Sequence, residues 1–184
     1  MLDLRHENDL ATLRSNGRRV NEQRKIICEL GVMNSSDAAG SAIFTIGNTK
    51  VAAFLQGPHQ ITARSAGQTL GGTTTMQRGI LNVRFFKTNF SGMDHKENIK
   101  KDMKMKEFCR VLKSVFEQVI MLEVYPKSQI DLQVFVLQAD GGYRSAAFNA
   151  VSLALMNAGI AMRDFLAATT AGLIQNVAVV DLIY

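Results

Sequence analysis

The sequence predicts an α+β fold with a mixed sheet and packed helices. The first reason is the order of the patterns: strands come first, followed by a helix, a strand, a second helix and further strands. Segregated strands of this kind, without a regular βα repeat, are typical of α+β domains. The second reason is composition, because 47% of the 184 residues are hydrophobic and can form one sizeable core.

Residues 1–23 are mostly polar, and we expect them to form an N-terminal arm. Asn16-Gly17 indicates a turn in this arm. Arginines cluster around the turn: Arg14, Arg18, Arg19 and Arg24. We expect residues 24–184 to form one domain, which begins with a short apolar strand in RKIICELGV.

The segment GSAIFTIGNTKVAAFLQGP predicts a hairpin. Apolar residues alternate on both sides of Gly47-Asn48, which suits a tight turn, and Gly57-Pro58 is expected to end the second strand. Residues 59–78 have no period and are rich in Gly, Thr and Ser, so they predict a long loop. Loops of this length are usually functional or disordered.

The middle of the chain predicts a strand, a helix and a second strand. ILNVRFF and IDLQVFVLQ both alternate apolar and polar residues, as half-buried strands do. Between them, a basic segment over residues 91–107 leads into a helix that Tyr125-Pro126 is expected to end. The apolar stripe of this helix consists of Phe108, Val111, Leu112, Val115, Phe116, Val119 and Ile120.

The last third of the chain predicts a second helix and two buried strands. Arg144 to Ala158 is rich in small residues that allow close packing against a sheet, and Gly159 closes this helix. FLAATTAGLI and VAVVDLIY then predict the two buried strands.

Charge and cysteine content narrow the functional classes. The net charge of +5 and the pI of about 9.4 favour an anionic partner such as nucleic acid, although a solvated basic face explains them equally well. Cys28 and Cys109 lie too far apart to indicate a zinc site or a disulfide framework, which fits a reducing compartment. The histidines have no ligand spacing, so no metal site is expected, and neither a signal peptide nor a membrane span is indicated.

The stretch QADGGYR carries the clearest chemical hypothesis. It places Gly141, Gly142, Tyr143 and Arg144 between a strand and a helix, where unpaired N–H groups and the helix dipole favour an anion. An arginine there can add a bidentate clamp on a phosphate. The alternative is an Asp140 cap followed by two turn glycines and an exposed arginine, and local chemistry leaves both possibilities open.

Several of these segments together resemble the RNase PH-like proteins. The segments are LRSNGRRVNEQR, GSAIFTIGNTKVAAFLQGP, SQIDLQVFVLQADGGYR and NAGIAMRDFLAA, and within the family they are most similar to the catalytic-type ring subunit of the RNA exosome. The resemblance implies an α+β fold like domain 2 of ribosomal protein S5. It also implies a hetero-hexameric ring of RNase PH-like subunits with RNA-binding cap subunits, located in the nucleus and nucleolus and also in the cytoplasm.

The resemblance also implies site residues. Inorganic phosphate, the co-substrate of active members, would bind at Gly141, Gly142, Tyr143 and Arg144, and Mg²⁺ is a second cofactor that the resemblance allows. Single-stranded RNA would contact Arg64 in the long loop. Independently of the resemblance, the charges of Lys100, Lys101, Lys104 and Lys106 near the start of the long helix suit RNA phosphates, and a plain solvated helix start is an equal alternative.

The sequence departs from the family pattern at several positions. Tyr143 stands where the family has Thr or Ser, Asn16 where it commonly has Asp, and Met103 where it has one of two basic residues. The family carries its catalytic aspartate in an acidic segment after the DL-x-Y strand, and this chain ends at Tyr184. We therefore expect a domain truncated at its C-terminus, with no catalytic residue assigned.

These features leave three functions open. The favoured one is a non-catalytic exosome ring subunit that binds and threads single-stranded RNA for 3′–5′ degradation and processing. The second is an active phosphate-dependent 3′–5′ exoribonuclease subunit in a full-length form. The third is RNase PH itself, which trims the 3′ ends of tRNA.

Overall fold

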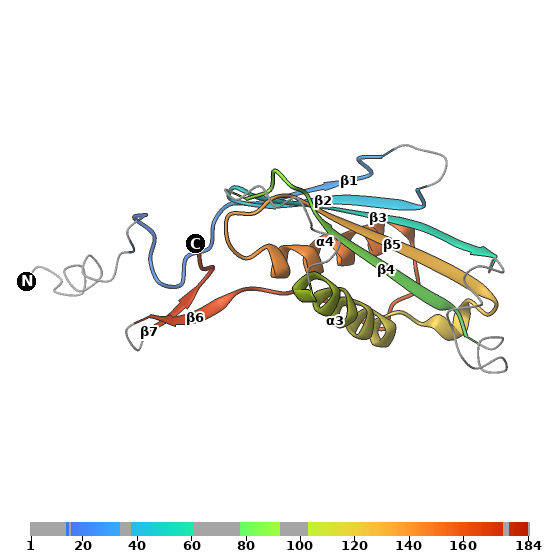
Figure 1. Ribbon diagram of the computed structural model, residues 1–184. Helices are drawn as coiled ribbons and strands as arrows, with labels where there is room; N and C mark the ends of the chain where they lie inside the picture. The colour runs from blue at the N-terminus through green and yellow to red at the C-terminus, as the bar shows by residue number, and fades with distance from the viewer. Residues whose placement is uncertain are drawn as a thin grey trace, which may run out of the picture.

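The computed structural model describes residues 14, 16–33, 38–60, 78–92, 103–174 and 177–183. In this part of the chain, five strands form a main sheet with the order β1-β2-β3-β5-β4, and helices α3 and α4 cover one face of it (Figure 1). The strands of the main sheet are β1 (Ile26–Leu30), β2 (Gly40–Ile46), β3 (Thr49–Gln60), β4 (Ile80–Lys87) and β5 (Ser128–Gln138). The helices are α3 (Met103–Val119), the 3-10 turn η3 (Leu122–Val124) and α4 (Tyr143–Ala158).

The predicted hairpin is confirmed. β2 and β3 pair antiparallel from Gly40↔Leu55 to Ile46↔Thr49, and Gly47 has the positive φ of 57° that the first position of a type II′ turn requires. The prediction that Gly57-Pro58 ends the second strand is wrong, because β3 continues to Gln60. The proline is accommodated because the pairing of β3 with β5 skips a register between Gln56 and His59, where no ladder N–H is needed at Pro58.

The sheet is mixed, as predicted. β4 and β5 are parallel from Ile80↔Gln129 to Lys87↔Val136, and the other pairings of the main sheet are antiparallel. A parallel pair needs a crossover connection, and α3 lies in the one between β4 and β5. The helix ends at Val119 and not at Tyr125-Pro126, because the chain leaves helical geometry to form a bridge between Ile120 and Met162 and then η3.

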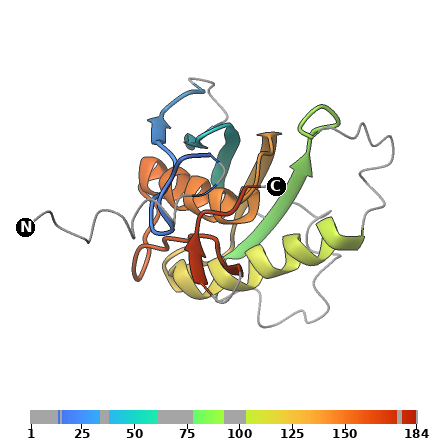
Figure 2. The same cartoon turned by 90° about the vertical axis from the view of Figure 1, so that its left-hand side faces the viewer.

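The core lies between the helices and one face of the main sheet. Every second residue of β2, β3, β4 and β5 points into it, and the stripe of α3 contributes Phe108, Leu112 and Phe116. Figures 1 and 2 agree that α3 and α4 lie on the same side of the sheet. One residue of the predicted stripe differs: Val111 is exposed, because it lies on the flank of α3 and faces away from the strands.

Helix α4 packs very close to β2, as its small residues predict. Ala147, Ala150 and Ala154 are completely buried. A Cβ atom on Gly40 of β2 would overlap the carbonyl oxygen of Ala154 and the side chain of Ala158. The close approach therefore depends on glycine in the strand and alanine in the helix. Neither this helix nor any other that is described is both long and apolar enough to span a membrane.

The last two strands form a separate ribbon. β6 (Ala171–Ile174) and β7 (Val177–Val180) pair only with each other, beyond the end of the main sheet and beside the N-terminal segment (Figure 1). The prediction of two buried strands is wrong here, because Leu173 and Ile174 are exposed and Val179 is the buried residue of the ribbon. A single two-stranded ribbon has no second layer on which to bury both of its faces.

Candidate anion site at the start of helix α4

The turn between β5 and α4 uses both glycines in left-handed conformations. Gly141 has a φ of 79° and Gly142 a φ of 66°. Helix α4 begins at Tyr143, one residue earlier than predicted, and its N-cap is Gly142, without a side-chain cap bond. Asp140 is therefore not the cap, whereas the two turn glycines and the exposed arginine of that alternative are present in the structure. The carboxylate of Asp140 instead accepts a hydrogen bond of 3.0 Å from Asn48.

The two glycines also meet neighbouring parts of the chain. A Cβ atom on Gly141 would overlap the carbonyl oxygen of Leu182, and one on Gly142 would lie 3.3 Å from the hydroxyl oxygen of Thr170. The sequence suggested that glycines here let an anion approach the backbone. In the structure they are required by the turn and by its packing against residues 170 and 182.

A surface hollow of about 350 Å³ lies at the start of α4, and we call it the α4 hollow. Gly142, Tyr143, Arg144 and Thr170 line it. The intrahelical hydrogen bonds begin with the amide of Ala146, which donates to Gly142 O at 3.1 Å. Among the described residues, no group accepts from the N–H groups of Tyr143, Arg144 and Ser145, which are the donors of a helix start and carry positive partial charge.

Two cationic side chains lie near the start of α4, and one of them, Arg144, lines the α4 hollow. The guanidinium of Arg144, which is exposed, lies 5.5 Å from the ring centre of Phe108 in α3. The ammonium group of Lys87, at the end of β4, lies 5.4 Å from the ring centre of Tyr143. Of the four predicted phosphate-site residues, Gly142, Tyr143 and Arg144 line the hollow and Gly141 does not, and Lys87 lies next to the ring of Tyr143. Sequence reasoning missed this lysine, although it directly follows the alternating run ILNVRFF.

The structure leaves most of the predicted RNA contacts untested. Arg64, Lys100 and Lys101 lie outside the described residues. Lys104 lies in the first turn of α3 and is exposed, next to Met103, whose exposed fraction is 71%. Lys104 therefore remains a predicted RNA contact, and Met103 offers an apolar side chain where the family pattern has a cation.

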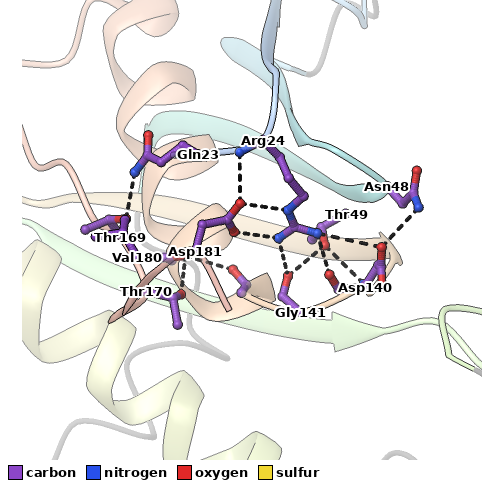
Figure 3. Close-up of polar contacts among 12 residues, drawn as sticks. Gln23, Arg24, Asn48, Thr49, Asp140, Gly141, Thr169, Thr170, Val180 and Asp181 are labelled. Atoms are coloured by element: carbon purple, nitrogen blue, oxygen red, sulfur yellow. Dashed lines mark hydrogen bonds and ion pairs between the residues drawn. The ribbon is translucent and has the colours of Figure 1, made fainter. Parts of the chain in front are cut away.

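Asp181 connects the turn to the N-terminal segment, an arrangement that sequence reasoning missed. Its carboxylate accepts hydrogen bonds from Arg24 Nε at 2.9 Å and Arg24 Nη2 at 2.7 Å (Figure 3). It also accepts a bond of 2.7 Å from Arg18 Nη1. The carbonyl oxygen of Asp181 accepts a bond of 3.0 Å from Arg14. We call these four residues the Asp181 network.

The Asp181 network is buried. The side chain of Asp181 is 2% exposed and that of Arg24 is 8% exposed. Burial alone would raise the pKa of the Asp181 carboxyl, but hydrogen bonds from Arg24 and Arg18 outweigh burial and lower the pKa to about 2. The carboxylate therefore stays charged and paired at neutral pH, and it is not available as an acid or base there.

The described residues contain no group of three or more His, Cys, Asp or Glu side chains that could hold a metal ion. Cys28 and Cys109 are both free thiols, and burial raises the pKa of the Cys109 thiol. His59 faces Asp131, with 3.3 Å between Nε2 and Oδ2. These groups lie on or near the main sheet, and none of them lines the α4 hollow.

The fold and the glycine turn agree with one protein family. The model of the 3′ exoribonuclease family, domain 1 (RNase PH), matches residues 22–161. The chain belongs to the RNase PH family. The match includes the Gly141-Gly142 turn, Arg144 and all of α4, so the candidate site lies within the family domain.

Curated relatives of this RNase PH-family chain are exosome components. The exosome complex component RRP41 homolog of Arabidopsis thaliana is 40% identical over 172 residues, which cover 94% of this chain and 68% of the relative. The human exosome complex component RRP41 is 40% identical over 92% of this chain and 66% of its own length. Exosome complex component ski6 of Schizosaccharomyces pombe is 36% identical, with 94% and 68% covered. The chain thus spans about two thirds of the length of these relatives.

Solved structures confirm the RNase PH-like fold. The crystal structure of rice Rrp46 superposes with a TM-score of 0.76 at 23% identity, and covers 92% of this chain and 73% of the rice chain. The Archaeoglobus fulgidus exosome with RNA bound to the active site gives a TM-score of 0.74 at 20% identity, with 98% and 76% covered. At these identities the likeness establishes the fold, and the α+β prediction with a mixed sheet is confirmed.

Proposed function

We propose that this chain is a ring subunit of an RNA exosome, where it binds and threads single-stranded RNA for 3′–5′ degradation and processing. The relatives that carry the name of exosome components, at 36% to 40% identity over most of this chain, support this proposal. In such a complex the chain would lie in a hetero-hexameric ring with other RNase PH-like subunits and with RNA-binding cap subunits. The expected locations are the nucleus, the nucleolus and the cytoplasm.

The α4 hollow is the proposed anion site of this subunit. The observation that supports it best is the combination of helix-start N–H groups with Arg144 in the lining of the hollow, and Lys87 adds a second cation next to the ring of Tyr143. A phosphoryl group is the ligand that suits this arrangement, since backbone donors and a guanidinium both match its oxygens. It would come either from inorganic phosphate or from the RNA backbone. Arg64, Lys100, Lys101 and Lys104 are proposed as further RNA contacts.

The guide function is the favoured form of the proposal because Met103 and Tyr143 both depart from the family pattern near the site. The α4 hollow has no carboxyl group among the described residues that line it. Asp140 and Asp181 lie behind the turn, paired with Asn48 and with arginines. A subunit of this kind would position RNA and pass it to a separate nuclease.

The second candidate is an active phosphorolytic subunit, and the presence of Arg144 next to unpaired N–H groups favours it. In that reaction an oxygen of inorganic phosphate attacks the last phosphodiester. The 3′-terminal nucleotide then leaves as a nucleoside diphosphate, and the shortened RNA keeps a 3′ hydroxyl. The proton that the leaving oxygen needs would have to come from a group outside the described lining of the hollow.

The deciding experiment measures nucleoside diphosphate release and RNA binding by the native complex that contains this chain. RNA binding that Arg144→Ala weakens, without release at any phosphate concentration, supports the guide function. Release that requires phosphate and disappears with Arg144→Ala supports the second candidate. Arg163→Ala is the matched control, because Arg163 is an exposed arginine beyond the other end of α4. Equal RNA affinity of the wild type and Arg144→Ala, without release, would contradict both.

A further inference from the structure

The backbone of the Gly141-Gly142 turn is held from its inner side by a set of hydrogen-bond donors. Arg24 Nη1 donates to the carbonyl oxygen of Asp140 at 2.5 Å, and Arg24 Nη2 donates to that of Gly141 at 3.2 Å. The hydroxyl of Thr49 also donates to Gly141 O, at 2.7 Å, and accepts from the amide of Asp140 at 3.0 Å. Both carbonyl groups therefore point toward the arginine and into the protein (Figure 3).

Asp181 in turn fixes the guanidinium of Arg24. The two side chains form a fork-to-fork pair through Nε and Nη2, and the backbone amide of Arg24 adds a third bond of 3.0 Å to the same carboxylate. Bidentate pairs of this kind define the orientation of both partners. The remaining N–H groups of the guanidinium then donate to the carbonyl oxygens of Asp140 and Gly141.

The direction of the carbonyls determines the direction of the amides that follow them. In a planar trans peptide the C=O of one residue and the N–H of the next point to opposite sides. With the carbonyl of Gly141 held inward, the N–H of Gly142 is directed away from Arg24. The carbonyl of Gly142 accepts from the hydroxyl of Ser145 at 2.8 Å, which holds the next peptide, with the N–H of Tyr143, in the same way.

We propose that Arg24, clamped by Asp181, is a positioning residue that holds the turn so that the N–H groups at the start of α4 face the α4 hollow. The inference rests on the proposed function of that hollow as a phosphoryl site. Arg24 does not line the hollow, so it acts through the backbone of Asp140 and Gly141 and not by contact with the ligand.

The geometry requires arginine at this position. A lysine could keep one charged bond to Asp181, but its single nitrogen cannot reach the carboxylate and both carbonyl oxygens together. Arg18 provides the matched control. It also donates to Asp181 Oδ2, but its bonds go to Asp181 and to Glu22 O, and none of them reaches the turn.

The test measures the affinity of the native complex for inorganic phosphate by calorimetry, with and without a bound RNA oligonucleotide. The two arms separate free phosphate from the phosphates of RNA. Arg24→Lys is expected to weaken phosphate binding about tenfold, about the loss of one hydrogen bond from a turn N–H group to the phosphate. Arg18→Lys is expected to leave the affinity within about twofold. Hydrogen exchange of the peptide that contains residues 141–145 should accelerate in Arg24→Lys only.

A second variant keeps the test decisive if Arg24→Lys does not fold. In the pair Arg24→Met with Asp181→Leu, both buried charges are replaced by apolar groups, a change that proteins often tolerate. Weaker phosphate binding by this folded pair supports the positioning role. Unchanged phosphate affinity of the double variant, or an equal loss of affinity in Arg18→Lys, overturns the positioning role. In that case Arg144→Ala still tests whether the α4 hollow binds phosphate. A wild type that binds no phosphate in either arm overturns the proposed site and the positioning role together.

Discussion

The main sheet with its helices and the region around Asp181 are stabilised in different ways. In the first region, alternating side chains from four strands and the stripe of α3 form one continuous apolar core. In the second, the N-terminal segment, the end of β7 and the glycine turn meet around one buried carboxylate. The ribbon β6-β7 supplies little apolar burial of its own.

The difference teaches which features of this RNase PH-family chain determine its fold and which prepare its site. Apolar burial is additive and tolerates small shifts, so it can define the sheet without defining single hydrogen bonds. A buried ion pair is costly unless all of its bonds are made, so it constrains geometry tightly. The turn that faces the α4 hollow is attached to the second kind of region. Three substitutions, in order of decreasing effect, test this contrast.

The largest effect is expected in the core. Phe116→Ala removes a completely buried ring that packs against Phe148, with 6.0 Å between ring centres. We expect the free energy of unfolding to fall by about 3 to 5 kcal/mol, because a large cavity remains. Urea denaturation measures this loss.

The control for this substitution is Leu173→Ala in the ribbon. Leu173 has an exposed fraction of 69%, so its truncation should change the free energy of unfolding by less than about 0.5 kcal/mol. Equal losses for both variants would contradict the distinction between a buried core and an exposed ribbon.

The sequence predicted the first region well because its signals are local. Alternation in IDLQVFVLQ and ILNVRFF identifies the faces of β5 and β4 without knowledge of their partners. The register at Pro58 and the end of α3 were not predictable, because both depend on contacts with distant residues. The exposure of β6 and β7 was missed for a related reason, since a short apolar run does not reveal whether a second layer exists to cover it.

The candidate site was predictable only in part. Gly141, Gly142, Tyr143 and Arg144 are contiguous, so their association with a helix start could be read directly from the sequence. Arg24 and Asp181 are 157 residues apart in the sequence, and no local pattern links them. The available signal was the cluster of arginines between residues 14 and 24, in which Glu22 is the one carboxylate, and this cluster does not identify a distant partner.

The second prediction concerns the pH dependence of stability. Because the pKa of Asp181 is lowered to about 2 in the folded protein from an ordinary value of 3.8, folding favours the ionised carboxylate. This contribution, roughly 2 kcal/mol, is complete above the unfolded pKa and is lost as the pH falls through the folded pKa. Asp181→Asn should remove this part of the acid destabilisation.

The measurement compares the free energies of unfolding of the wild type and Asp181→Asn at about pH 5.5 and about pH 2.5. The wild type should lose roughly 1.5 kcal/mol more than the variant between these two conditions, because pH 2.5 is still above the folded pKa. Parallel losses would show that the carboxylate is not paired as the structure has it.

The smallest effect is expected at an exposed ion pair of the same chemical type. Arg78 Nη2 and Glu123 Oε1 are 3.8 Å apart, and both side chains are more than half exposed, at 53% and 67%. Water and salt screen such a pair, so Glu123→Gln should change the free energy of unfolding by less than about 0.5 kcal/mol and by still less in high salt. Denaturation at low and at high ionic strength measures this change.

We attribute the rigidity of the Asp181 network to its burial and not to charge pairing as such. This view would be contradicted if, at neutral pH, Glu123→Gln lowered the free energy of unfolding as much as Asp181→Asn does. The expected contrast between the exposed pair and the buried Asp181 network explains how the network can hold the turn at the site. An arginine and a carboxylate at the surface can separate and re-form without consequence. Inside the protein, the same pair cannot separate without leaving a charge uncompensated, so the turn carbonyls bonded to Arg24 are held in one orientation.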